Sequence, residues 1–118
     1  MRLRAYLEAQ GFEVLNLEAE PTAAKSGNQG INDQDPSVVV EFASRACRPD
    51  ADALLCSCTA WRSVEAVDAL ERRTSKPVVT SNQATIWMAL GAIGVMQPVR
   101  GFGRLFERPA PVAVGTAR

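Results

Sequence analysis

Two apolar stretches, each followed by polar residues and then an amphipathic helix, constrain the fold of this chain more than any other feature. Residues 53–57 are mostly apolar and lead into Cys58 and Thr59, and residues 77–80 lead into Ser81 and Asn82. Strands that helices cover on both faces of a sheet have this composition. We therefore predict an α/β fold of three layers, in which a small parallel sheet is flanked by helices.

The other elements follow from local patterns. An apolar face predicts a helix over residues 2–10, which Gly11 would end, and alternation predicts a strand over residues 12–17. The polar, glycine-containing stretch of residues 18–36 is typical of a long loop. Further helices are expected from the Asp35-Pro36 start up to Pro49, over residues 61–73 and over residues 83–91. Residues 94–118 have the composition of an irregular tail, in which Val112 to Val114 form a weak strand candidate.

Length and composition exclude several classes of protein. The 118 residues indicate a single domain over 1–118, and 13 basic against 13 acidic residues provide no overall field that would attract nucleic acid. No stretch is apolar for the length of a membrane span, and the N-terminus does not resemble a signal peptide. Three cysteines, an odd number, favour reduced thiols over a disulfide framework. We therefore expect a cytoplasmic protein that binds neither nucleic acid nor a membrane.

The candidate site lies where the two apolar stretches end. Parallel strands bring their carboxyl ends to one edge of a sheet, where ligands bind, so Cys58 and Thr59 should lie near Ser81 and Asn82. A thiol has an ordinary pKa of about 8.5, which a helix N-terminus can lower. Two simpler interpretations stay open: Cys58 is an inert packed residue, or Ser81 and Asn82 only cap a helix.

A metal site is not expected. The chain contains no histidine, and Cys56 and Cys58 have no second cysteine pair that would complete a set of four ligands. Cys47 and Cys56 are predicted core residues, and Trp61 is predicted to pack near the start of a helix.

Residues 51–90 carry a resemblance to a known family. The stretch from Leu54 through Ser57-Cys58-Thr59, followed by Pro77-Val78-Val79-Thr80-Ser81-Asn82-Gln83-Ala84, resembles the second half of the aspartate/glutamate racemase superfamily. The similarity is greatest to the branch that contains maleate cis-trans isomerase and arylmalonate decarboxylase. Residues 2–14 and 101–105 match the same half in order and spacing, so the resemblance covers most of the chain.

The resemblance implies a flavodoxin-like half of a two-part enzyme that needs no cofactor. It implies isomerisation, racemisation or decarboxylation of a small carboxylic or dicarboxylic acid, in which Cys58 moves a proton at the carbon beside a carboxylate. Backbone N–H groups at Thr59, with Ser81 and Asn82 opposite, would bind the carboxylate. Asn32 lies in a stretch that resembles the family's active-site loop, although solvent exposure alone would explain a polar residue there.

This chain also departs from the family. Full-length members are about twice as long, and the first half, with its own cysteine, is absent here. The strand that precedes the first helix is missing as well, which would leave a gap between the predicted strands over residues 12–17 and 53–57. We expect a partner chain, or the tail around Val112 to Val114, to close it. The chain would then be part of a homo-oligomer or pair with a separate first-half subunit; a non-catalytic truncated remnant is the alternative.

Overall fold

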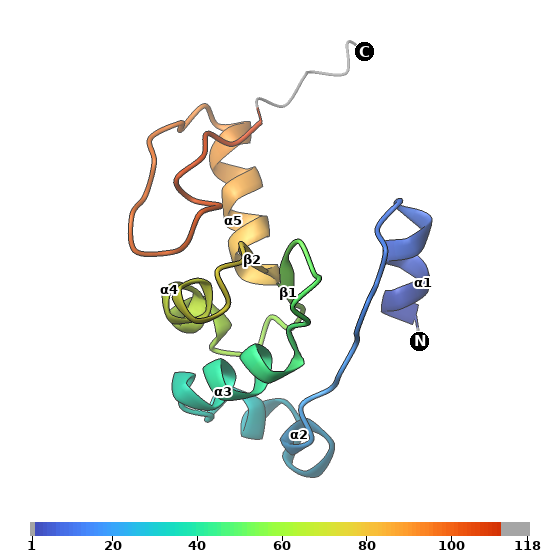
Figure 1. The fold of residues 1–118 in the computed structure, drawn as a ribbon. Helices are drawn as coiled ribbons and strands as arrows, with labels where there is room; N and C mark the ends of the chain where they lie inside the picture. Colours follow the sequence, from blue (N-terminus) through green and yellow to red (C-terminus); the bar gives the residue numbers. More distant parts are fainter. Residues whose placement is uncertain (1, 112–118) are drawn as a thin grey trace.

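Within the described residues, a sheet and five helices form an α/β fold, as predicted (Figure 1). The computed structural model describes residues 2–111, except for the side chains of residues 23 and 24. The order of elements is α1 (Arg2–Ala9), α2 (Thr22–Asn32), α3 (Pro36–Ala46), β1 (Leu54–Cys56), α4 (Ser63–Thr74), β2 (Val78–Thr80) and α5 (Ser81–Ala92). β1 and β2 pair in parallel, with Leu54 opposite Val78 and Cys56 opposite Thr80.

The core lies between α3, α4 and the sheet. α3 packs against α4, and α4 packs against β2. The buried apolar side chains of the core cluster come from these elements: Val39, Ala43, Cys56, Ala66, Val67, Leu70 and Val78. The helix start at Asp35 is confirmed, because its carboxylate accepts a hydrogen bond from the Ser37 N–H at 2.8 Å and Pro36 occupies the first turn.

The predicted strand over residues 12–17 is wrong. α1 ends as expected at Gly11, whose φ is +89°, and the Phe12 N–H donates to the Leu7 carbonyl at 3.1 Å. The following segment, however, pairs with no strand within residues 2–111. Extended backbone becomes a strand only beside a partner, and none lies next to this segment.

The predicted loop over residues 18–36 is also wrong in part, because it contains α2. The Glu20 carboxylate accepts a hydrogen bond from the Thr22 N–H at 2.9 Å and thereby binds a free N–H group at the start of the helix. Gly27, at φ +60°, interrupts the helix, which continues to Asn32. The glycine-containing stretch is therefore helical on both sides of Gly27.

Two details at the strand ends differ from expectation. α4 begins at Ser63, two residues later than predicted, and α5 begins at Ser81. The cap of α5 is Thr80, whose hydroxyl accepts from the Gln83 N–H at 3.1 Å while the Gln83 side chain accepts from the Thr80 N–H at 3.2 Å. Ser81 is therefore a first-turn residue and does not cap the helix.

The segment after α5 contacts α4 through the carboxylates of Asp68 and Glu71. Glu71 accepts N–H groups from Val78 at 3.0 Å and from Arg104 at 3.0 Å, and Asp68 accepts the Gly103 N–H at 3.1 Å. Beyond Ala92 the described part of the chain, to residue 111, contains no helix or strand. The strand candidate at Val112 to Val114 lies outside the described residues.

Candidate functional site

The turns that follow β1 and β2 lie against each other. The Asn82 side-chain N–H donates a hydrogen bond to the Thr59 carbonyl at 3.1 Å. This contact joins the first turn of α5 to the segment after β1. The structure therefore brings Asn82 beside the turn that contains Cys58 and Thr59.

A tight turn separates Cys58 from α4. The Trp61 N–H donates to the Cys58 carbonyl at 3.4 Å, which closes a turn over residues 58–61. Its central residues are Thr59 and Ala60, whose N–H groups take no part in that bond. Within residues 2–111 no other hydrogen bond uses these two N–H groups. They are available to an anion as turn donors, whereas the sequence predicted helix N-terminal donors.

The Cys58 side chain lines a cavity of about 310 Å³. The cavity lies between α1, residues 16–20, α3 and β1, and its lining includes Leu3, Phe42, Leu55 and Trp61. Cys58 itself is half-buried. A small molecule in this cavity could reach the thiol, and its charged end could reach the adjoining turn.

The other two cysteines have different surroundings. Cys56 is 3% exposed, and burial, with a smaller contribution from Cys47, raises the pKa of its thiol to about 11. Cys47 caps the end of α3 and is half-buried, so the prediction that it is a core residue is only partly correct. Cys58 is the only described cysteine that opens to the cavity without being buried in the core.

The other two predicted site residues, Ser81 and Asn32, make no hydrogen bond to the turn after β1 in the described structure. Ser81 is half-buried in the first turn of α5, and its carbonyl accepts the Thr85 hydroxyl at 2.9 Å. Asn32 is exposed at the end of α2, and in the described structure it makes no hydrogen bond to the turn after β1. Its neighbour Ile31 lines the cavity.

Sequence reasoning missed a polar chain that fixes the turn after β1. The Trp61 indole N–H donates to the Gln34 side chain at 2.7 Å, and the Gln34 amide donates to the Glu20 carboxylate at 2.8 Å. Trp61 also packs on Phe42, with ring centroids 6.0 Å apart. Because Glu20 and Gln34 lie in a stretch that looks like a polar loop, no local sequence signal marks them.

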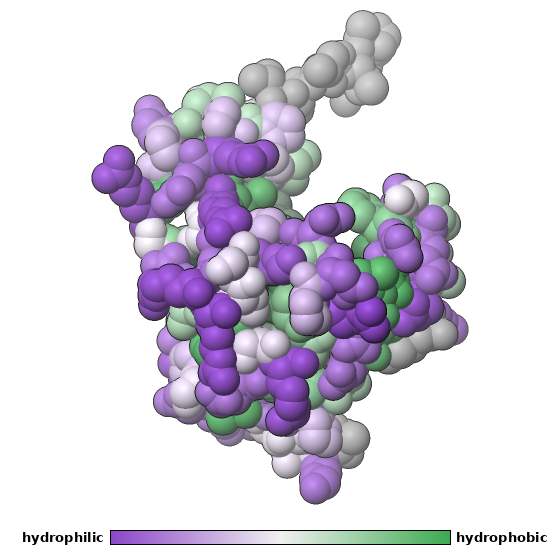
Figure 2. All heavy atoms as spheres, viewed as in Figure 1, coloured by the Kyte–Doolittle hydropathy of each residue, from purple (hydrophilic) through white to green (hydrophobic). Residues whose placement is uncertain are grey.

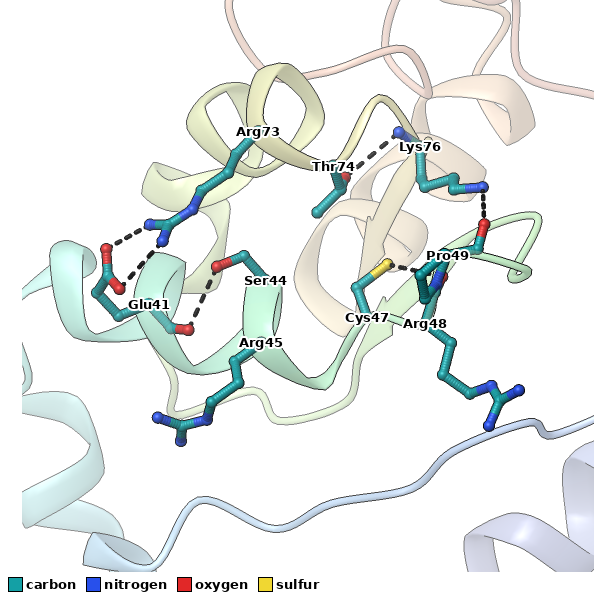
Figure 3. Close-up of a pocket in the computed structure, with 9 residues that line it drawn as sticks. All are labelled: Glu41, Ser44, Arg45, Cys47, Arg48, Pro49, Arg73, Thr74 and Lys76. Carbon is teal, nitrogen blue, oxygen red and sulfur yellow. Dashed lines mark hydrogen bonds and ion pairs between the residues drawn. The ribbon is translucent and has the colours of Figure 1, made fainter.

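A second hollow, of about 540 Å³, lies at the C-terminal ends of α3 and α4 (Figure 3). Basic side chains surround it, but most are engaged: Arg73 pairs with Glu41, Arg48 pairs with Asp50 at 2.8 Å, and Lys76 donates to the Pro49 carbonyl at 2.9 Å. Cations at helix C-termini are a common stabilising arrangement. This hollow does not include Cys58.

The described residues include no group of three or more cysteine, aspartate or glutamate side chains arranged to hold a metal. None of the helices in residues 2–111 has the length and apolar character to cross a membrane.

Comparison with known proteins assigns the chain to a family. The family model of arylmalonate decarboxylase matches residues 1–106. The chain belongs to the arylmalonate decarboxylase family. It is 34% identical over 94 residues to the arylmalonate decarboxylase of Bordetella bronchiseptica, and the match covers 74% of this chain and 39% of that relative.

Solved structures agree with this assignment. Unliganded arylmalonate decarboxylase superposes with a TM-score of 0.77 at 29% identity over 90% of this chain and 45% of that one. A maleate isomerase from Pseudomonas putida S16, solved with maleate, superposes with a TM-score of 0.63 at 28% identity over 70% of this chain and 33% of that one. This member of the arylmalonate decarboxylase family thus spans less than half the length of the relatives it matches.

Proposed function

We propose that this chain forms one side of a carboxylate site in which Cys58 transfers a proton at the carbon beside the carboxylate, without a cofactor. The observation that carries the proposal is the Asn82 contact with the Thr59 carbonyl, because it holds the two strand-end turns together beside the thiol. Family membership supports the same chemistry, since the named relatives decarboxylate arylmalonates or isomerise maleate.

The residues present can perform one defined step. Loss of carbon dioxide from the carbon beside a carboxylate, or transfer of its proton to the Cys58 thiolate, leaves an electron pair that spreads onto the remaining carboxylate as an enediolate. N–H groups of Thr59 and Ala60 and the Ser81 hydroxyl would stabilise that charge. The Cys58 thiol would then donate its proton to carbon, and the resulting thiolate would regain a proton from water. Asn32 would contribute only if α2 moves toward the turn or the substrate extends to it.

The substrate class that fits is a small dicarboxylate. The lining of the cavity is mainly apolar, which suits an aryl or alkyl substituent, and the free turn N–H groups suit one carboxylate. The rest of the substrate would contact protein that these residues do not supply, either a separate first-half subunit or a second copy of the chain.

Exchange of the α-proton in deuterated water tests the proposal. Phenylmalonate and malonate would be followed by proton NMR with the wild-type chain, Cys58→Ala and the matched control Cys47→Ala. We expect the wild type and Cys47→Ala to give exchange or turnover above the protein-free rate. Cys58→Ala should give only the protein-free rate. Equal rates for the wild type and Cys58→Ala would refute the role of the thiol.

One observation favours a second function, that of a non-catalytic or oligomerising subunit. Residues 77–99 contain no charged residue, and α5 exposes Ile86 and Met88, while Ile93 beyond it is 74% exposed. Figure 2 shows apolar surface around the C-terminal end of α5. Asn82, Ile86 and Ile93 recur at helical spacing, so this surface continues from the candidate site.

Sedimentation of the wild type would test this role. For an oligomerising surface we expect self-association that Ile86→Glu abolishes. Ser37→Glu, at an exposed position of α3, should retain it. A monomer at 100 µM would exclude it.

A further inference from the structure

The turn over residues 58–61 depends on side chains more than on its own backbone. The hydrogen bond that closes it, from the Trp61 N–H to the Cys58 carbonyl, is 3.4 Å long, beyond the usual range of about 2.7–3.2 Å. The Arg62 side chain, at the N-cap of α4, makes no capping hydrogen bond in the described structure. The position of Trp61, and with it the shape of the turn, is therefore set mainly by side-chain contacts.

The indole of Trp61 makes two such contacts. Its ring packs edge-on against Phe42, with ring centroids 6.0 Å apart, and its N–H donates to the Gln34 side chain at 2.7 Å. Trp61 lines the cavity, as Cys58 does, whereas Gln34 is not part of the lining. Gln34 therefore contacts the site through Trp61 and not from within the cavity.

Gln34 can meet the indole in one orientation only. An indole N–H is a donor, so the amide oxygen of Gln34 faces Trp61 and the amide nitrogen is left to find an acceptor elsewhere. That acceptor is the Glu20 carboxylate, at 2.8 Å, which also accepts the Thr22 N–H at 2.9 Å. Hydrogen bonds to a carboxylate are stronger than those between neutral groups. The connection between α2 and α3, where Gln34 lies, is thus tied to the turn after β1.

The second tryptophan provides a comparison within the same chain. The Trp87 indole N–H donates to the backbone carbonyl of Arg108 at 3.0 Å, which satisfies the donor without any oriented side chain. The Trp61 N–H instead depends on a side chain that is itself oriented by a carboxylate. The arrangement around Trp61 therefore fixes a direction as well as satisfying a donor.

We propose that Gln34 is a positioning residue that acts through Trp61. By holding the indole, it keeps the turn in the arrangement in which the Thr59 and Ala60 N–H groups are open to an anion. Donors that are already ordered stabilise a negative charge better than donors that must be ordered when the ligand binds. The inference rests on the proposed carboxylate site, and it also predicts properties of the ligand-free chain.

Three variants provide the test. Gln34→Leu removes the amide and keeps a side chain of similar size. The matched control is Gln29→Leu, because Gln29 is exposed on α2 and donates to Asp33 at 2.9 Å, away from the turn. Trp61→Phe keeps an aromatic ring and removes the indole N–H, so it breaks the same bond from the other side.

Proton–nitrogen NMR of the ligand-free proteins gives the first measurement. In Gln34→Leu we expect the Trp61 indole N–H to exchange about fivefold faster, the ratio that corresponds to one net hydrogen bond of ordinary strength. The amide signals of Thr59 and Ala60 should shift in Gln34→Leu and in Trp61→Phe, and should not shift in the control. The Trp87 indole signal should stay in place, which shows that the fold is retained.

Titration with phenylmalonate gives the second measurement. Gln34→Leu should raise the dissociation constant about fivefold, and the control should leave it unchanged. Equal dissociation constants for the wild type and Gln34→Leu would overturn the inference. A wild type that binds no phenylmalonate would refute the proposed carboxylate site, and the ligand-free spectra would still decide the role of Gln34.

Two results in the ligand-free spectra would also overturn the inference. Unchanged Trp61 indole exchange in Gln34→Leu would show that the bond does not hold the indole. Faster indole exchange with unchanged Thr59 and Ala60 signals would show that Gln34 only satisfies a donor. If Gln34→Leu does not fold, the same signals in Trp61→Phe give the answer, because that variant lacks the same bond.

Discussion

Alkylation by iodoacetamide should separate the three thiols by their surroundings. The thiolate is the reactive form, and at pH 8 a thiol with an ordinary pKa of about 8.5 is about one-quarter ionised. The pKa of Cys56, raised by burial to about 11, leaves about one thiol in a thousand ionised at that pH. Ionisation alone thus slows Cys56 by about 200-fold, and its 3% exposure slows it further. We predict that Cys58 reacts faster than both Cys47 and Cys56.

Two variants make the measurement unambiguous. Cys47→Ala retains Cys56 and Cys58, and Cys58→Ala retains Cys47 and Cys56. Intact-mass kinetics should give one fast and one slow adduct in each variant, and tandem mass spectrometry should place the slow adduct at Cys56. Between pH 8 and pH 9 the Cys56 rate should rise about tenfold, because both values lie below its pKa of about 11.

Either of two results would refute the reasoning. Cys58 labelling no faster than that of Cys47 would count against a functional thiol in the cavity. A Cys56 rate within tenfold of that of Cys58 would show that burial does not suppress its ionisation.

Two stability measurements test the packing around the site. In Gly103→Ala the new Cβ would lie 2.3 Å from Val67 Cγ1 at a φ of +80°, so we expect the free energy of unfolding in urea to fall by about 2–4 kcal/mol. In the control Gly101→Ala, where φ is +89° and no atom lies within 4 Å, it should fall by only about 1 kcal/mol. Equal losses in the two variants would contradict the contact with Val67. Because the Cys56 thiol ionises less readily folded than unfolded, its contribution to stability is complete below pH 9.0 and lost as pH rises to about 11. Over that range the free energy of unfolding of the wild type should fall by up to about 3 kcal/mol more than that of Cys56→Ala. If the unfolding free energies of the two proteins change with pH in parallel, the effect is excluded.

The elements from residue 35 onward could be predicted because their signals are local. Asp35 with Pro36 marks a helix start, and the apolar stretches before Cys58 and Ser81 mark two parallel strands whose ends meet. The contact between Asn82 and Thr59 follows from that topology. The cap of α5 at Thr80 was mistaken because Thr80, Ser81 and Asn82 all have side chains that can cap, and only the backbone angles identify which one does.

The polar chain from Trp61 through Gln34 to Glu20 could not be predicted. Its members are separated by 27 and 14 positions in the sequence, and each has an ordinary surface or packing role when considered alone. α2 was missed for a related reason: its first N–H is bound by the Glu20 side chain, and its glycines made the stretch look like a loop.

Two departures from the predicted sheet have one physical cause. Residues 12–17 alternate as a strand does but pair with no strand among the described residues. Leu55 lies in an apolar stretch typical of a strand covered on both faces, yet it is 44% exposed. Both would be correct in a sheet with a strand between them, because that strand would supply the ladder for the first and the cover for the second. The cavity of about 310 Å³ lies between these two segments. The gap predicted between the two segments therefore corresponds to this cavity.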